Sequence, residues 1–116
     1  FFTRDWRYGM TEARPDPQTG LIAEADVVVA ADADGDALAR GIVVYLTALH
    51  ELGHALGLSH TAAIADIMYL FRYPDDGGRF FGAYRKRLRS ADDIGSARAT
   101  GLSAEDVREL RALYAR

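Results

Sequence analysis

The sequence predicts a small α+β domain, in which a short twisted sheet packs on one central helix and a helical part follows. Three observations support this fold class. Residues 1–30 contain two strand-like stretches around a turn rich in proline and glycine. Residues 36–56 form a long, largely apolar segment with helical character, and residues 79–116 contain helical spacing behind serine caps. The 116 residues match the size of one domain, which we expect to span residues 1–116.

The two predicted strands lie on either side of residues 14–20. Phe1–Met10 alternates large apolar residues with largely polar ones, which favours a half-buried strand. Residues 14–20 place prolines early and a glycine last, as turns do. Leu21–Ala30 is rich in valine and predicts the second strand. We expect the two strands to pair as a hairpin.

The acidic segment Asp32–Asp36 permits two interpretations. It resembles a calcium loop, but it lacks the glycine at position six and the glutamate at position twelve of an EF-hand. The favoured interpretation is the start of a helix, with Asp34 or Asp36 as N-cap, because carboxylates stabilise the positive end of a helix dipole. Calcium binding at this segment stays the alternative.

Residues 50–60 read H-E-x-x-H-x-x-G-x-x-H and contain every histidine of the chain. At about 100° per residue, His50 and His54 share one helix face with Cβ atoms about 5–6 Å apart, a separation that suits two nitrogens on one zinc ion. Glu51 points to one side, where it can reach a metal-bound water without being a ligand. His60 would lie about 15 Å along a continuing helix. We therefore expect the helix to end at Gly57 and the chain to turn back.

The same helix is expected to bury an apolar stripe opposite the histidines, formed by Tyr45, Leu49, Leu52 and Leu56. Three histidine ligands leave a fourth zinc position for water, as in catalytic sites, whereas structural sites are closed by four protein ligands. The chain has no cysteine, so we expect no second zinc site of the histidine or cysteine type.

Composition sets limits on the partners. A formal net charge of −3 gives no support for general nucleic-acid binding, and the longest apolar run, Gly41–Leu49, is too short to span a bilayer. Arg79–Arg89 mixes basic and aromatic residues, which we interpret as a solvated helix face with an apolar underside, with nucleic-acid contact as the alternative.

Pro74–Gly78 predicts a loop. Ser90 and Ser103 each precede an acid by three residues and predict two short capped helices.

From the zinc motif onward the chain resembles the metzincins, and within them it is most similar to the matrixins. Met68 stands eight residues after His60 in an Ile-Met-Tyr context, like the matrixin Met-turn, and residues 102–114 resemble the C-terminal helix of the family. The resemblance implies that Met68 packs beneath the zinc ligands and that Asp106 braces the Met-turn. It also implies that Val27–Ala30 is the edge strand that pairs with an extended substrate.

The chain departs from the family pattern at several places. Only 49 residues precede His50, so we expect the sheet to be shortened or an N-terminal portion to be missing, and an opening Phe1 suggests a processed or excised segment. The histidine-rich loop of the family and its structural zinc are absent. Leu70 stands where matrixins commonly have proline, so their specificity-pocket wall does not carry over directly to Leu70–Pro74.

The resemblance implies a zinc-dependent endopeptidase acting on peptide or protein substrates. His50, His54 and His60 would bind Zn²⁺, and Glu51 would activate the zinc-bound water. One alternative is a latent or truncated binding or inhibitory module without turnover. Another is a different zinc hydrolase, although a bacterial endoribonuclease family with this histidine spacing lacks the glutamate. A secreted or extracellular location is favoured by the resemblance alone.

Overall fold

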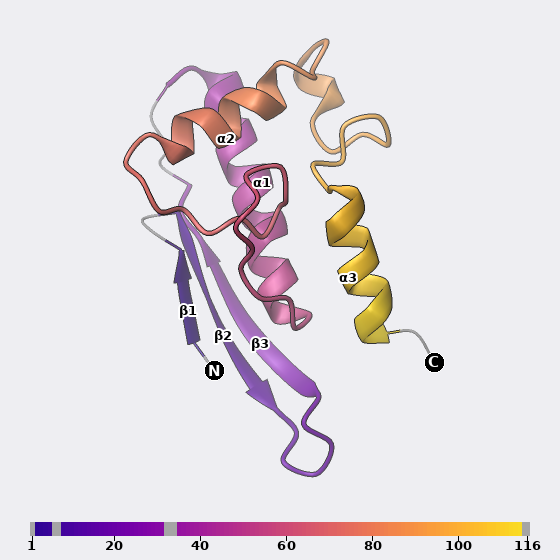
Figure 1. Cartoon of the computed structure of the whole chain (residues 1–116). Coiled ribbons are helices and arrows are strands. Elements are labelled where there is room, and N and C mark those ends of the chain that lie inside the picture. The colour runs from indigo at the N-terminus through magenta and orange to yellow at the C-terminus, as the bar shows by residue number, and fades with distance from the viewer. Residues whose placement is uncertain (1, 6–7, 32–34, 115–116) are drawn as a thin grey trace.

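The computed structural model describes residues 2–5, 8–31 and 35–114. In these residues, a three-stranded antiparallel sheet lies along one long helix, and two further α helices follow (Figure 1). The sheet order is β1-β2-β3, with strands Phe2–Asp5, Gly9–Pro15 and Ile22–Val29. The helices are α1 (Ala37–Ala55), α2 (Asp76–Arg85) and α3 (Ala104–Tyr114). The predicted α+β class is confirmed at this level.

The hairpin forms across the predicted turn, but its first strand is β2 (Gly9–Pro15) and not a strand over Phe1–Met10. β2 and β3 pair across the turn, where Gly20 N–H donates to Asp16 O. The second strand is therefore confirmed, but a single strand over Phe1–Met10 is wrong. Asp5 pairs with Gly9, so the chain doubles back within that segment and forms two antiparallel strands. The apolar alternation alone could not reveal this reversal, because both short strands keep the same period of two.

Helix α1 begins and ends as predicted. The Asp36 carboxylate accepts a hydrogen bond from Ala39 N–H, which makes Asp36 the N-cap. Gly57 adopts φ +105°, and Leu58 N–H donates to Gly53 O, so the helix is closed by a left-handed glycine. Asp32–Asp34, the rest of the alternative calcium segment, lie outside the described residues.

The predicted burial of α1 is wrong for part of the helix. Leu52 and Leu56 are 51% and 46% exposed, while Ile42 and Leu46 are fully buried. The reason is the chain reversal after Gly57, which lays residues 58–69 over the histidine-bearing side of α1. The side that carries the ligands is thus also the side that enters the core.

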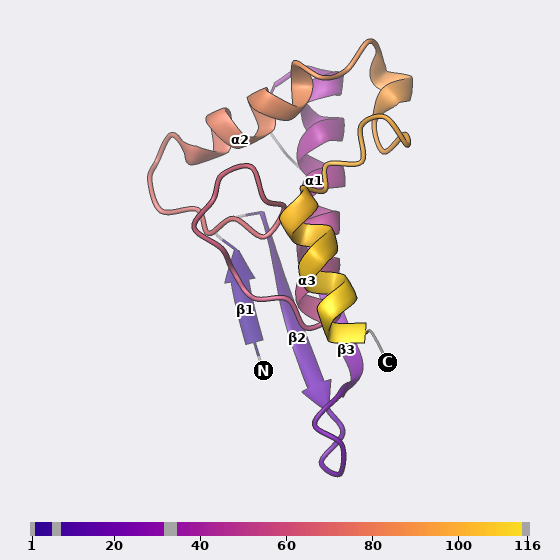
Figure 2. The same ribbon diagram turned by 45° about the vertical axis from the view of Figure 1, so that its right-hand side comes forward.

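The hydrophobic core lies between α1, this returning segment and α2. α3 lies on a further side of the molecule, next to the end of α1 (Figure 2). The buried core residues are Ile42, Leu46, Leu58, Ile67, Met68, Tyr69, Phe80, Tyr84 and Ala99. Among the described residues, no helix is long and apolar enough to cross a membrane.

Helix α2 starts inside the segment predicted as a loop. The buried Asp76 carboxylate accepts hydrogen bonds from the backbone N–H groups of Arg72 and Tyr73 at 2.8 and 3.0 Å, and from Tyr69 OH at 2.8 Å. Gly77 is needed because a Cβ there would lie 2.5 Å from the Tyr8 hydroxyl. Close packing, rather than turn formation, therefore explains this glycine.

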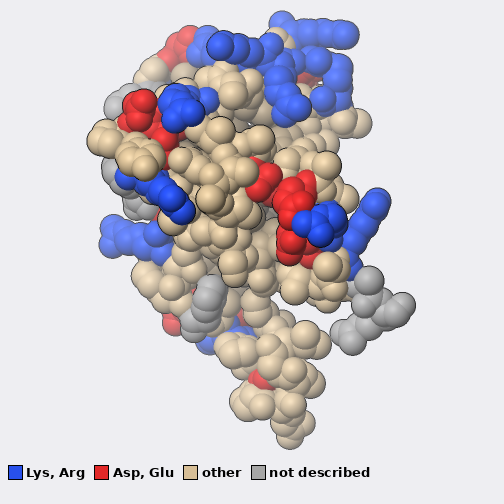
Figure 3. Space-filling model, in the orientation of Figure 1, with Lys and Arg blue, Asp and Glu red and all other residues tan. Residues whose placement is uncertain are grey.

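The basic stretch over α2 has the predicted helix face. Phe80 and Tyr84 are buried, whereas Arg79, Arg85 and Lys86 are exposed. Figure 3 shows lysine and arginine side chains gathered over this end of the molecule. Part of their charge is paired, since Arg85 contacts the Asp36 carboxylate at 3.0 Å.

Of the two predicted C-terminal helices, the second is confirmed. Ser103 Oγ accepts from Asp106 N–H at 3.0 Å, and the Asp106 carboxylate accepts from Ser103 N–H at 2.7 Å, which is a reciprocal capping box. The first prediction is wrong in extent, because only a 3-10 turn forms at Ala91–Asp93. The left-handed Gly95 follows, at φ +75°, and the Asp93 carboxylate accepts from Arg89 N–H instead of supporting a longer helix.

Candidate metal centre

Three histidine side chains converge beside α1. His50 and His54 project from the helix one turn apart, and His60 comes from the returning segment. Ring centroids are 4.9 Å apart for His50 and His54, 5.3 Å for His50 and His60, and 4.6 Å for His54 and His60. The structure thus brings together the three residues that the motif spacing predicts, and their role as ligands stays a prediction.

Backbone carbonyls orient two of the imidazoles. His50 Nδ1 lies 2.6 Å from Ile67 O, and His54 Nδ1 lies 3.0 Å from Leu58 O. Because a carbonyl only accepts, each neutral ring carries its proton on Nδ1 and donates it there. Each Nε2 then carries the lone pair that can bind a metal ion, which is the usual tautomer of a ligating histidine.

A carboxylate that the sequence analysis did not single out completes the cluster. Asp5, the last residue of β1, is 5% exposed. Its Oδ2 atom lies 3.1 Å from the Nε2 atoms of both His50 and His54, and its Oδ1 atom lies 2.5 Å from His60 Nε2. Burial raises the pKa of the Asp5 carboxyl, but the three histidines outweigh this and hold its pKa far below the usual range.

The four side chains fit a zinc ion. Each offers one ligand atom, and these atoms lie within 4.8 Å of one another. Four ligands at about 2.0–2.2 Å from zinc in a tetrahedron would be roughly 3.3–3.6 Å apart, whereas the contacts of Asp5 with the histidines and of His54 with His60 are somewhat shorter here, at 2.5–3.2 Å. Two of the inward atoms, His50 Nε2 and Asp5 Oδ2, are buried and have no hydrogen-bond partner among the residues that the structure describes. A cation between them would satisfy both.

Glu51 lies beside this cluster, fully buried. Its Oε1 atom accepts a hydrogen bond from Thr11 Oγ1 at 2.6 Å, and its Oε2 atom has no partner among the described residues. Burial first, and then the neighbouring Asp5, raise the pKa of the Glu51 carboxyl to about 8. Thr11, on β2, therefore fixes one oxygen of Glu51 and leaves the other unpaired.

The segment beneath the histidines is built around Met68. Met68 is 1% exposed, and a Cβ at Gly53 would lie 2.4 Å from its sulfur atom. Thr61 N–H donates to Met68 O, and Ile67 N–H donates to the Asp106 carboxylate at 2.8 Å. Since Ile67 O also contacts His50, a chain of contacts connects α3 to a candidate ligand.

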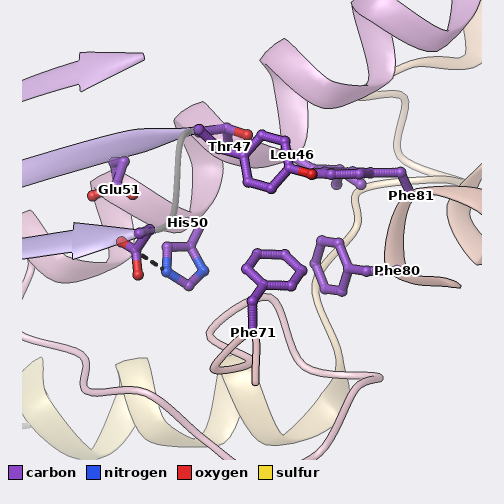
Figure 4. A pocket seen from close by; sticks show the side chains of 9 residues that line it. Leu46, Thr47, His50, Glu51, Phe71, Phe80 and Phe81 are labelled. Carbon is purple, nitrogen blue, oxygen red and sulfur yellow. Dashed lines mark ion pairs between the residues drawn. The ribbon is translucent and has the colours of Figure 1, made fainter. Parts of the chain in front are cut away.

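A narrow aromatic cavity of about 10 Å³ lies beside His50 and Glu51, with room for roughly one water molecule (Figure 4). Phe71 and Phe80 line it and contact each other edge to face, with ring centroids 5.2 Å apart and an angle of 83° between the ring planes. The other lining residues are Asp5, Tyr8, Leu46, Thr47 and Phe81. Phe71, within the segment Leu70–Pro74 to which the family's pocket wall does not carry over directly, lines this cavity.

Two site residues, Asp5 and Thr11, escaped the sequence analysis. Neither belongs to a spaced motif: Asp5 is brought to α1 by the pairing of β1 with β2, and Thr11 lies on β2, which packs directly on α1. The available signal was weak: Asp5 is an acid within an aromatic stretch that was predicted to be one strand.

Comparison with known proteins gives one finding. The model of a peptidase family described as Matrixin matches residues 3–80, more than half of the chain. No curated protein and no solved structure matches. The matched segment includes Asp5, strands β2 and β3, α1 and all three histidines.

Proposed function

This chain belongs to the matrixin family of metallopeptidases, and we propose that it is a zinc-dependent endopeptidase that hydrolyses peptide bonds. The observation that carries the proposal is the convergence of three imidazoles from the motif beside a buried glutamate. The family membership supports metallopeptidase chemistry, and the nitrogen and oxygen donor set supports zinc.

In this proposal His50, His54 and His60 hold the zinc ion through their Nε2 atoms. A bound zinc ion would polarise the scissile carbonyl and lower the pKa of a water molecule toward about 7. The carbonyls of Ile67 and Leu58 keep two of the rings in the required tautomer. Met68 beneath the ligands, braced through Ile67 by Asp106, fits the role of a Met-turn.

Glu51 is assigned as the general base and acid. It takes a proton from the attacking water and later delivers it to the leaving amine. The base must be ionised for the first step. The pKa of Glu51, raised in the present arrangement, would fall with a divalent cation among the histidines, because a nearby positive charge favours the carboxylate. Thr11 keeps one oxygen in place and leaves Oε2 for the water.

An extended peptide would add to an open sheet edge. In the described sheet β1 and β3 are the two edges, and β1 ends at Asp5 in the metal centre. We therefore assign substrate pairing to β1 in place of Val27–Ala30. The Phe71 ring would restrict the side chain accommodated next to His50 to a small one.

The test is cleavage of an unfolded protein substrate by the zinc-loaded chain, compared with a Glu51→Ala variant and with a chelated sample. Glu51→Ala should bind zinc normally and lose at least about 100-fold in turnover, because general acid–base catalysis contributes that much or more. A Glu109→Ala variant, which removes an exposed carboxylate from α3, should cleave like the parent. Cleavage by Glu51→Ala at the parent rate would refute the assignment.

A further inference from the structure

We propose that the Asp5 carboxylate is a fourth protein ligand, which closes the metal centre in the resting protein and must leave before water and substrate can reach the metal. This inference rests on the proposed zinc site. It adds a regulatory state to that site, because a catalytic zinc keeps one position open whereas four protein ligands close it.

The contacts of Asp5 carry the inference. One oxygen contacts two histidines and the other contacts the third, all at 2.5–3.1 Å, so the carboxylate lies where a fourth ligand or a water would lie. Its Oδ2 atom is buried and makes no hydrogen bond among the described residues, which leaves a lone pair directed into the cluster. The side chain is 4% exposed and excludes bulk water.

Strand pairing in the sheet places Asp5 at this position. Asp5 pairs with Gly9 on β2, and Gly9 lies against α1 so closely that a Cβ would be 3.0 Å from both Glu51 Cγ and Thr47 Cγ2. The backbone opposite Asp5 is therefore packed directly onto the active-site helix. The contact of Gly9 with α1 therefore positions both Asp5, which closes the site, and Glu51, the proposed general base.

Opening is a ligand exchange without oxidation or reduction. The bond from the Asp5 oxygen to the metal breaks, and a bond from a water oxygen to the metal forms. An anionic ligand strengthens zinc binding and at the same time competes with external ligands. Removing the Asp5 carboxylate should therefore weaken the binding of zinc and strengthen the binding of external ligands to the zinc. Loss of a residue with only a structural role would not shift these two affinities in opposite directions.

The experiment uses Asp5→Asn, which keeps the shape of the side chain and removes its charge. Glu12→Gln is the matched control, because Glu12 is an exposed carboxylate on the adjacent strand. Zinc affinity is measured by competition with a chromophoric chelator. Binding of acetohydroxamate to the zinc-loaded proteins is measured by calorimetry, and circular dichroism checks that each protein is folded.

Asp5→Asn should weaken zinc binding by about 10–100-fold, by analogy with the loss of groups that support metal ligands. It should tighten acetohydroxamate binding about tenfold, if the carboxylate occupies the position nine-tenths of the time. Glu12→Gln should change neither. Unchanged or weaker acetohydroxamate binding by folded Asp5→Asn would overturn the inference.

A second measurement covers the case in which Asp5→Asn does not fold. A crystal structure of the zinc-loaded parent should place an Asp5 oxygen about 2.0–2.2 Å from zinc, and water in that position would overturn the proposal.

The peptidase proposal and the closure proposal can be refuted independently of each other. Opposite affinity shifts without cleavage by any zinc-loaded variant would refute the peptidase alone, whereas cleavage by the parent with no effect of Asp5→Asn on acetohydroxamate would refute the closure alone.

Discussion

At the scale of single residues, the metal centre depends on side chains that act in pairs across elements. Glu51 is held by Thr11 from the sheet, and His50 is held by the Ile67 carbonyl from the returning segment. Each pair joins a motif residue to a partner at least 17 positions away in sequence. In the proposed function, the motif residues would carry out the chemistry and these partners would orient them.

The Thr11 hydroxyl gives the prediction at this scale. Thr11→Val removes the hydrogen bond to Glu51 with little change of shape, so turnover should fall about 10–100-fold while zinc affinity stays the same. Thr11→Ser keeps the hydroxyl and should restore most of the rate. Steady-state kinetics with a zinc titration would check this, and an equal loss in both variants would show that packing rather than the hydroxyl matters.

At the scale of elements, two helical glycines, Gly53 on α1 and Gly82 on α2, differ in what surrounds them. Gly53 faces the Met68 sulfur at a distance that leaves no room for a methyl group, whereas Gly82 on α2 has no non-local atom near the place of a Cβ. The intrinsic helix preference for alanine is the same at both positions. Packing therefore decides the difference between them.

Substituting these two glycines should give effects of opposite sign. Gly53→Ala should lower the free energy of unfolding by about 1–2 kcal/mol, because overpacking a buried contact outweighs the gain in helix propensity. Gly82→Ala should raise it by about 0.5–1 kcal/mol. Urea unfolding monitored by circular dichroism would measure both, and a stabilising Gly53→Ala would show that Met68 can move aside.

At the scale of the whole molecule, the metal centre joins parts that are distant in sequence. Asp5 comes from the sheet, two histidines from α1 and the third from the returning segment, so a bound ion would link all three. The inward atoms of His50 and Asp5 are buried and have no hydrogen-bond partner within the described part of the chain, which costs stability. Metal binding should therefore stabilise the fold itself.

Zinc at 100 times its dissociation constant should stabilise the chain by about 2.7 kcal/mol and raise its melting temperature by roughly 10 °C. A chelator should reverse the shift, and His60→Ala should largely abolish it without altering α1. Thermal unfolding with and without zinc checks this expectation. A melting temperature that zinc does not change would contradict the assigned site.

The sequence by itself determined the local features: helix α1 with an aspartate cap at Asp34 or Asp36, the left-handed end at Gly57, and the shared face of His50 and His54. These follow from backbone geometry and from spacings of a few residues, which any context preserves. Only the tertiary structure decided that Phe1–Met10 folds back on itself, that Asp5 reaches the histidines and that Leu52 stays exposed. These features depend on contacts between segments that are distant in sequence, and such contacts produce no periodic pattern in the amino-acid sequence.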